Sequence, residues 1–394
     1  MKSLISLAVI LFLAGCGGEN SSNDETKTAY KPAVVQGSIQ SISGNTVTVN
    51  GHSYIVASVT FNNVSLSVSE LQPNMKITIS SSSAAGTSFY NEGGDKNPHS
   101  SGTNHAELNP TLTGLIGDIN HTTGSFTVNG IELSFPNLSP EIKVGDWVMV
   151  SSLPAADSGY TVLSVVAFEQ ADLIGHIEVE GLVNNLTDTN FTLGNLIAVD
   201  YSGAVVEDNV VLQNGLWVEV NGSMNGAVLV ATEVEVESDI NLGHDIEIEG
   251  RITWVDQNLT SFELNHQVRF EVNSSTRFDD GRQQDLKLGR LVEVTSKQQN
   301  NQNIAVEIEF DDDNDNNWMN NDIEFEGRVI SVDNTTLSFV IEAMNGAQTT
   351  IYTNHRTLYE DRLTFGTLYN QRIEVEAYKV NGQYIATEIE SDID

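Results

Sequence analysis

The densest group of chemically capable residues is an acidic segment, residues 307–326, which reads EIEFDDDNDNNWMNNDIEFE. It holds nine acidic residues and no basic residue. Asp311, Asp313 and Asp315 alternate along it, and Asp322 stands at the twelfth position counted from Asp311. Alternate carboxylates on a tight loop converge on one hard cation, and this spacing is typical of calcium-binding loops. The spacing makes these four residues a candidate calcium site.

Three departures from the calcium-loop pattern keep a second interpretation open. Asn316 stands at the sixth position, where glycine usually allows a sharp turn, and Asp322 replaces the bidentate glutamate of the last position. Alternating apolar residues on both sides of the segment predict strands, where such a loop usually has helices. The second interpretation is a solvated acidic linker without a bound ion. The sequence indicates no other cofactor.

The N-terminal segment has the pattern of a lipid-attachment signal. Lys2 gives it a positive start, and residues 4–13 are an apolar stretch too short to span a bilayer as a stable helix. The residues LAGC, which end at Cys16, resemble the lipobox of bacterial lipoproteins, where the cysteine thiol takes the lipid. Cys16 is the only cysteine of the chain, so it has no disulfide partner. The alternative is an ordinary secretory signal with a chance cysteine.

The resemblance to lipoproteins implies a processed and anchored protein. Residues 1–15 would be the signal peptide, and the polar residues 16–34 a flexible tether behind the lipid. Acyl chains contribute about 0.8 kcal/mol per buried CH₂, so several chains make a durable anchor. Gly17 follows the cysteine, and by the sorting pattern of these lipoproteins the absence of aspartate there favours the outer membrane. The protein would then face the periplasm or the cell surface.

The net charge limits the classes of partner. The chain of 394 residues has 54 acidic and 18 basic residues, a formal net charge of −36 at pH 7. Such a surface repels nucleic acid and anionic headgroups. The sequence also lacks the basic groove with aromatic platforms that binds single-stranded nucleic acid. A cation, a cationic peptide, a glycan or another envelope protein stays open as the ligand.

Motifs of the common enzyme classes are missing. The sequence contains no His-Glu-x-x-His, no Gly-x-Ser-x-Gly and no glycine-rich phosphate loop. Carboxylate pairs occur throughout so acidic a chain, and a glycosidase-like pair stays open on motif grounds. The acids that recur between repeats, however, lie on the predicted closing strands and alternate there with Val and Ile, which is typical of a solvated face. We therefore predict a protein that is not an enzyme.

Five copies of one module carry these residues. Each copy opens on Gly-x-(Ile/Val)-x-x-(Ile/Val/Leu), at Gly37, Gly114, Gly181, Gly250 and Gly327, with intervals of 77, 67, 69 and 77 residues. A fixed period of this size indicates tandem small domains. Asn-Gly pairs between alternating runs predict hairpins with type I′ turns, because both residues tolerate positive φ.

Each module is predicted to be an all-β, five-stranded Greek-key barrel of the OB type, because five strands in about 70 residues match that fold. The recurring glycine is interpreted as the point where the first strand bends. In the last copy we expect strands at 323–332, 336–342, 348–353, 371–379 and 383–390. The predicted repeats are 35–82, 111–172, 173–239, 240–311 and 312–394, with a disordered linker at 83–110.

The Gly-x-Ile opening, the Asn-Gly hairpin and the close G-x-x-V-E-V … A-x-E-I-E resemble an uncharacterised bacterial family. It is numbered five-six-six-six among the domains of unknown function and occurs as tandem repeats in lipoproteins. The resemblance covers roughly residues 35–394 and is weakest in the first repeat, where LQPNMKITI replaces the glycine-led strand. It implies an OB-like fold and an envelope location, and supplies no catalytic residues. We expect a non-enzymatic, lipid-anchored array of binding or spacer modules, with a calcium-responsive array as the alternative.

Overall fold

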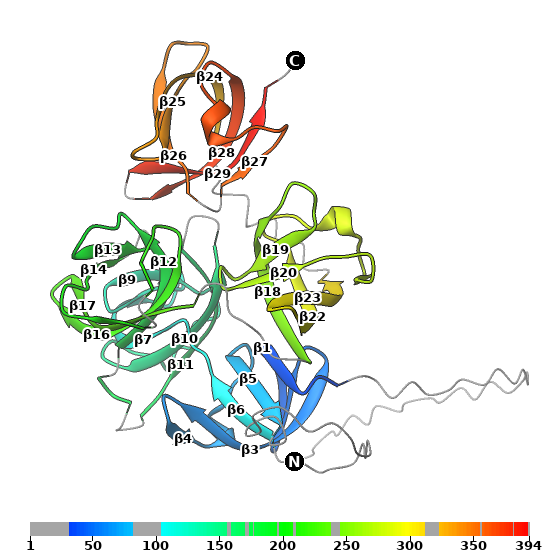
Figure 1. Ribbon diagram of the computed structural model, residues 1–394. Coiled ribbons are helices and arrows are strands. Elements are labelled where there is room, and N and C mark those ends of the chain that lie inside the picture. The colour runs from blue at the N-terminus through cyan, green and yellow to red at the C-terminus, as the bar shows by residue number, and fades with distance from the viewer. Residues whose placement is uncertain are drawn as a thin grey trace, which may run out of the picture. The chain divides into compact units, whose positions relative to one another are not determined.

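The computed structural model describes residues 31–81, 104–155, 159–169, 173–175, 177–194, 197–207, 210–237, 245–311, 323–354, 357–380 and 382–392. In these ranges the regular elements are β-strands and short 3-10 turns, as the all-β prediction requires (Figure 1). The described part of the chain has no helix that is long and apolar enough to cross a membrane. Pro32–Asp394 is one compact unit, built from successive β modules.

The first module is a closed five-stranded barrel. Its elements are β1 (Val34–Ser43), β2 (Thr46–Val49), β3 (His52–Phe61), β4 (Val64–Leu66), η1 (Val68–Glu70), β5 (Lys76–Ser81) and β6 (Asn104–Leu108). The ring runs β1-β2-β3-β6-β5 and closes because β5 pairs with β1. β3 and β6 are parallel, and the other neighbours in the ring are antiparallel.

The prediction of a disordered linker at 83–110 is wrong for part of this range, because the range contains β6. Asn104–Leu108 lies inside that range, yet it is the fifth strand of the first barrel. Ala106 and Leu108 are buried in the core at 0% and 4% exposure. Without this strand, β3 and β5 would each leave an unpaired edge, so the chain gains backbone hydrogen bonds by returning here.

The third, fourth and fifth modules repeat this ring. The third has β12 (Ile177–Asn184), β13 (Asn190–Leu193), β14 (Ile197–Asp200), β15 (Val205–Val206), β16 (Trp217–Asn225) and β17 (Val228–Val236). The fourth has β18 (Ile246–Val255), β19 (Ser261–Leu264), β20 (Val268–Glu271), β21 (Arg277–Asp279), η3 (Gln283–Asp285), β22 (Leu291–Gln299) and β23 (Gln302–Phe310). The fifth has β24 (Ile323–Asp333), β25 (Ser338–Glu342), β26 (Gln348–Tyr352), β27 (Leu358–Tyr359), η5 (Phe365–Thr367), β28 (Arg372–Val380) and β29 (Gln383–Ser391).

All three rings have the strand order of an OB-type Greek-key barrel. Going round each ring, the five main strands follow the sequence order first, second, third, fifth, fourth and back to the first, with the third and fifth parallel. The small, closed, OB-like barrel is therefore confirmed. The five strands predicted for the last repeat all fall on strands of the fifth module.

The second module departs from the prediction of a closed barrel. It has β7 (Leu112–Asn120), β8 (Ser125–Val128), β9 (Ile131–Ser134), β10 (Trp147–Pro154) and β11 (Tyr160–Ala167). These strands pair in the order β9-β8-β7-β10-β11. Among the described residues β9 and β11 do not pair, so this ring is open, whereas the other four modules are closed.

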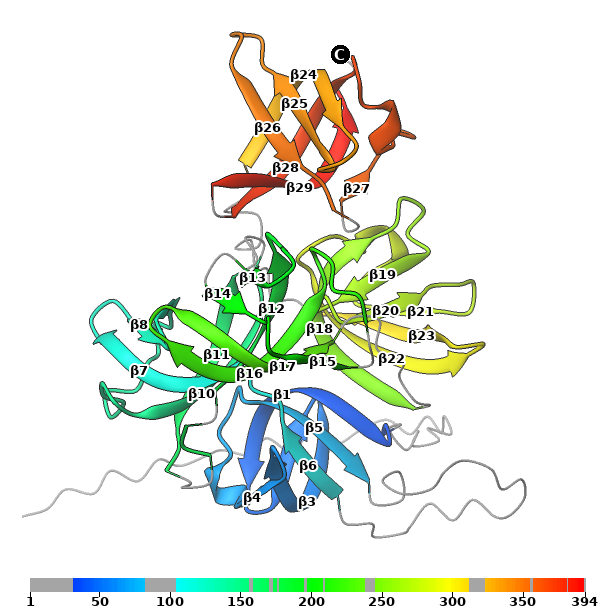
Figure 2. The ribbon, with the colours of Figure 1, turned by 60° about the vertical axis from the view of Figure 1, so that its left-hand side comes forward.

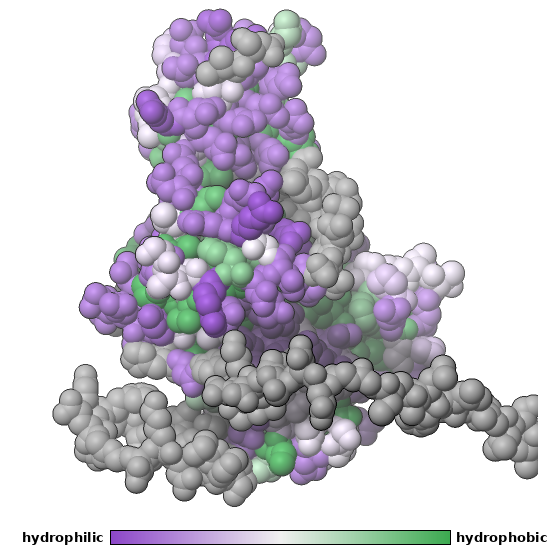
Figure 3. Space-filling view, turned by 90° about the vertical axis from the view of Figure 1, so that its right-hand side faces the viewer, coloured by the Kyte–Doolittle hydropathy of each residue, from purple (hydrophilic) through white to green (hydrophobic). Residues whose placement is uncertain are grey.

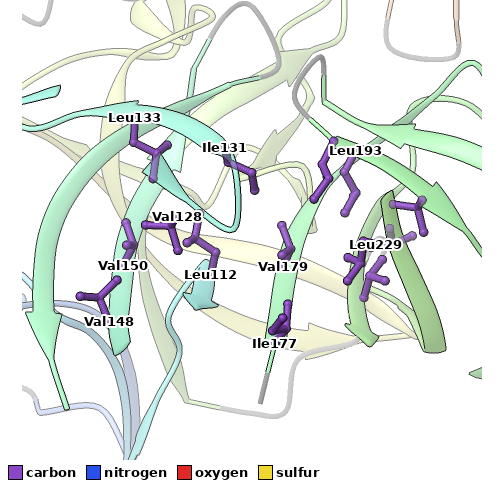
Figure 4. Packing of buried hydrophobic residues seen from close by; sticks show 14 of the residues in the cluster. Leu112, Val128, Ile131, Leu133, Val148, Val150, Ile177, Val179, Leu193 and Leu229 are labelled. Carbon is purple, nitrogen blue, oxygen red and sulfur yellow. The ribbon is translucent and has the colours of Figure 1, made fainter. Parts of the chain in front are cut away.

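The cores consist of the inward-facing Val, Ile, Leu and Phe of each strand. The fourth and fifth modules have separate apolar clusters. The cluster of the first module also includes Met149 and Val166 of the second. The second and third modules share one cluster, because Val179 of β12 stands opposite Leu112 of β7. Figure 4 shows side chains from both modules in this shared cluster. Figure 2 shows the strands that carry them from a second direction.

The recurring glycine is required by packing as well as by the bend. An ideal Cβ on Gly114 would lie 2.0 Å from the amide nitrogen of Asn129, which closes the Asn-Gly hairpin with φ 53°. The Asn129 side chain hydrogen-bonds the backbone on both sides of the glycine, at 3.0 and 2.9 Å. Asn265 does the same around Gly250. The register shift expected of the bend follows soon after the glycine in four modules.

Candidate functional site

Only one of the four predicted calcium ligands lies in the described part of the chain. Asp311 is exposed at the end of β23, and its backbone nitrogen donates a hydrogen bond to the carbonyl of Leu291 at 3.2 Å. Asp313, Asp315 and Asp322 lie outside the described residues, as does the predicted lipid attachment residue Cys16. The calcium loop and the lipid anchor stay predictions.

The structure brings together a different set of acids, on the outer face of the first, fourth and fifth strands of a module. In each of the last three modules, three glutamates stand directly opposite one another on these strands. They are Glu180–Glu219–Glu235, Glu249–Glu293–Glu309 and Glu326–Glu374–Glu390. We call each set the first row. Opposite residues have Cβ atoms about 4.5–5.5 Å apart and share a face, so like charges there repel.

A second row lies two residues along each strand and therefore on the same face. It consists of Glu178–Asn221–Glu233, Glu247–Thr295–Glu307 and Glu324–Glu376–Glu388 in the three modules. We call the two rows together the carboxylate grid. Only in the fifth module does glutamate occupy all six positions. The first two modules lack the first row of glutamates, with Gln36–Thr78–Glu107 and Thr113–Met149–Val166 at its positions.

Strand alternation places these glutamates outward. In β16, Val218 and Val220 point into the core with 0% exposure, so Glu219 between them must lie on the outer face. The sequence interpretation of recurring acids as a solvated face is therefore right about their side of the strand. That interpretation concerned the closing strands. On the opening strands, for which the sequence made no such prediction, Glu178, Glu180 and Glu247 are buried, at 3%, 7% and 7% exposure.

The first module covers these buried glutamates. The side-chain amide of Asn62 donates a hydrogen bond to Glu178 at 2.9 Å. The backbone nitrogen of Ser38 donates to Glu249 at 3.0 Å, and His52 lies 3.4 Å from a carboxylate oxygen of Glu247. Between the modules, β1 also pairs with β18 in parallel over three residues (Figure 1). The outer faces of the third and fourth modules thus receive donors from the first.

Two further groups act on Glu180. The indole nitrogen of Trp217 donates a hydrogen bond to its carboxylate at 3.1 Å. Burial raises the pKa of Glu180, while the positive charge of Lys76 and the bond from Trp217 oppose that shift. Lys76 is itself only 9% exposed, and it also lowers the pKa values of Glu237 and Glu249 against their burial. The positive charge of this one lysine therefore stabilises the charged form of carboxylates in two modules.

Two glutamates on fourth strands have strongly raised pKa values. Burial, followed by repulsion from Glu178 and Glu180, raises the pKa of Glu219 to about 9. Burial, followed by repulsion from Glu247 and Glu249, raises the pKa of Glu293 to about 8. Both are central members of a first row, so repulsion from acids on neighbouring strands adds to the effect of burial.

In the fifth module the carboxylates come close enough to share a cation. Oxygens of Glu324, Glu326 and Glu374 lie within 4.8 Å of one another, and so do those of Glu360, Glu388 and Glu390. Burial, followed by repulsion from Glu360, raises the pKa of Glu388 to about 7. Sequence reasoning recognised the repeated acids on the closing strand but not these groups, because they depend on register across three strands.

The raised pKa values predict an unusual pH dependence of stability. A carboxyl group with a raised folded pKa contributes stability that is fully present below its unfolded pKa, about 4.5, and is lost as pH rises through the folded pKa. For Glu219 and Glu293 this window extends to about 9 and about 8. We expect the urea midpoint to fall as pH rises across the window, and Glu219→Gln and Glu293→Gln to flatten the profile.

The control for this experiment is Glu141→Gln, which changes an exposed acid of the second module outside any carboxylate grid. Its pH profile should match that of the unaltered protein. A midpoint that stays constant or rises between these pH limits would contradict the assignment, as would profiles for Glu219→Gln and Glu293→Gln that keep the full slope.

Comparisons with known proteins identify the repeats that carry the grid. No match to a curated protein was found. Among solved structures, drosophila Unr CSD456 is similar at 15% identity over 54% of this chain and 96% of that chain, with a TM-score of 0.14. The family model "Domain of unknown function (DUF5666)" matches residues 180–235, 249–309 and 326–390. Each matched range begins and ends at the outer glutamates of a first row. The family model therefore matches the third, fourth and fifth modules, with one matched range in each.

Proposed function

We propose that this is a non-enzymatic, lipid-anchored envelope protein whose modules bind positively charged ligands through the carboxylate grid. The observation that carries the proposal is the first row of glutamates. It occurs in each of the last three modules, on the same face of the barrel. Like charges on opposite strands destabilise a sheet. A feature that costs stability and nevertheless recurs three times is best explained by groups that neutralise it. In the third and fourth modules the first module supplies such groups, and in the fifth a ligand would supply them.

The position of the grid favours binding over catalysis. The carboxylate grid spreads its carboxyl groups over the outer face of three strands in each module. An extended charged face of this kind suits a ligand with several positive charges. It is also not on the face of the second and third strands, where OB-type barrels commonly bind nucleic acid or sugar. A cation or a cationic polypeptide is the ligand class that fits this surface.

The envelope location in this proposal rests on Cys16 and on the residues around it. Lipid attachment at Cys16 would hold the array at the membrane, and Gly17 favours the outer membrane. Residues 17–30 would separate the first barrel from the lipid. The binding modules would then face either the periplasm or the cell surface.

Replacing the attachment residue tests the anchor. Cys16→Ser should move the protein from the detergent phase to the aqueous phase in a Triton X-114 partition, because it removes the thiol that accepts the lipid. It should also abolish incorporation of labelled fatty acid. Ser21→Ala, a similarly small change in the predicted tether, should leave both unchanged. Detergent partitioning that survives Cys16→Ser would contradict the anchor.

Calcium binding is a second candidate function, favoured by the two groups of three carboxylates in the fifth module. Calcium takes six to eight oxygen ligands, and carboxylates are its usual protein ligands. The group of Glu324, Glu326 and Glu374 is formed by two neighbouring strands. It is distinct from the loop of Asp311, Asp313, Asp315 and Asp322, so the two possible sites can be tested separately.

Unfolding in millimolar calcium and in EDTA distinguishes these sites. At a calcium concentration about one hundred times the Kd, one site should add about 2.7 kcal/mol to the stability of its module. If the gain disappears in the double variant Glu324→Gln, Glu326→Gln, the site is the grid. If it disappears in Asp313→Asn, Asp315→Asn, the site is the predicted loop. Equal midpoints in calcium and EDTA would reject calcium as the ligand.

A further inference from the structure

The carboxylate grid of the fifth module is open where its counterparts are covered. Glu324 and Glu326 of β24 are exposed. Their counterparts in the third module, Glu178 and Glu180, are buried, as is Glu247 in the fourth. In Figure 3 the fifth module lies at the top, and its visible surface is predominantly hydrophilic. The same surface thus occurs in two states within one chain.

The covered copies show what chemistry occupies such a face. Asn62 and Ser38 of the first module place N–H donors on Glu178 and Glu249, at 2.9 and 3.0 Å. Lys76, on β5 of the same module, supplies a positive charge that acts on acids of both covered modules. The occupant is therefore a polypeptide that presents hydrogen-bond donors and an ammonium group.

The spacing of the grid defines the form of the occupant. Its two rows are two residues apart along a strand, a rise of about 6.6 Å. An extended segment with lysine at alternate positions places its ammonium groups at the same interval, all on one side. A helix is a less close match, because its residues on one face, three or four positions apart, rise about 4.5–6 Å.

Arginines limit the surface at one end. Arg328 and Arg372 stand opposite each other two residues beyond the first row, on the same face. Arg372 forms an ion pair with Asp392 at 2.6 Å. A lysine of the occupant would be repelled by Arg328 and Arg372, so the attractive region comprises the two glutamate rows. This boundary fixes how far the occupant can shift along the strands.

We propose that the carboxylate grid of the fifth module is a docking surface for an extended, lysine-bearing segment of another protein. The inference rests on the proposed binding function and assigns it a surface and a class of partner. Charge complementarity and the covered counterparts in the third and fourth modules support it. The chain itself, at a net charge of −36, is poorly suited to supply the lysines from a second copy.

Binding of a defined peptide tests the proposal. The probe is a short fluorescent peptide in which lysine alternates with threonine, added to the chain from Gly17 onward and followed by anisotropy. The triple variant Glu324→Gln, Glu326→Gln, Glu374→Gln should bind it roughly tenfold more weakly, since exposed ion pairs are individually weak and the variant removes three of them. The control Asp118→Asn, Glu132→Gln, Glu141→Gln removes three exposed acids from the second module and should bind normally.

Three other outcomes would contradict the proposed docking surface, and each would point to a different explanation. Equal weakening in both triple variants would show non-specific attraction, leaving the general cationic ligand class intact and this surface wrong. No binding of the peptide, together with a calcium response lost in Glu324→Gln, Glu326→Gln, would make the grid an ion site. Self-association in sedimentation that the first triple variant abolishes would identify a second copy as the occupant.

Discussion

Repulsion between carboxylates held side by side on three strands is the constraint to which the outer surface of this protein responds. Glu219 stands between Glu180 and Glu235 at the spacing of paired strands, so the three cannot all be charged without cost. The structure relieves this repulsion in two ways. The first module supplies hydrogen bonds and the positive charge of a lysine, and some of the glutamates keep their protons. In the fifth module Glu324 and Glu326 stay exposed, which leaves room for an external cation.

The barrels tolerate this repulsion because their stability comes from the opposite face of the same strands. A pair of like charges across two strands costs roughly 0.2–1 kcal/mol. A fully buried valine or isoleucine contributes about 1.5–3 kcal/mol, and Val218, Val220 and Val234 are all at 0% exposure beside the first row of the third module. The alternation of Val and Glu thus lets one strand hold the core together and carry a charged surface that evolution can use for binding.

Local sequence patterns were enough to predict the barrels. The candidate site could not be predicted, because it is formed by residues that are far apart in the sequence. Period-two alternation located the five main strands of the fifth module, and the repeated glycine located the bend. The sequence missed β6 because Asn104–Leu108 is short and follows a long segment rich in Ser, Gly and Asn, a composition typical of a loop. It missed the first rows because residues such as Glu180 and Glu219 become neighbours only through strand register. Burial of Glu178 could not be predicted either, because it depends on a contact with Asn62 from another module.

The central claim is that folding brings carboxylates together and makes them hold protons. Potentiometric titration of the folded chain, compared with the same chain unfolded in urea, measures this directly. The account predicts that the folded chain binds more protons between about pH 4.5 and about pH 9, the range over which the pKa of Glu219 is raised. Coincident titration curves over that range would contradict it, because the glutamates would then ionise as they do in the unfolded chain.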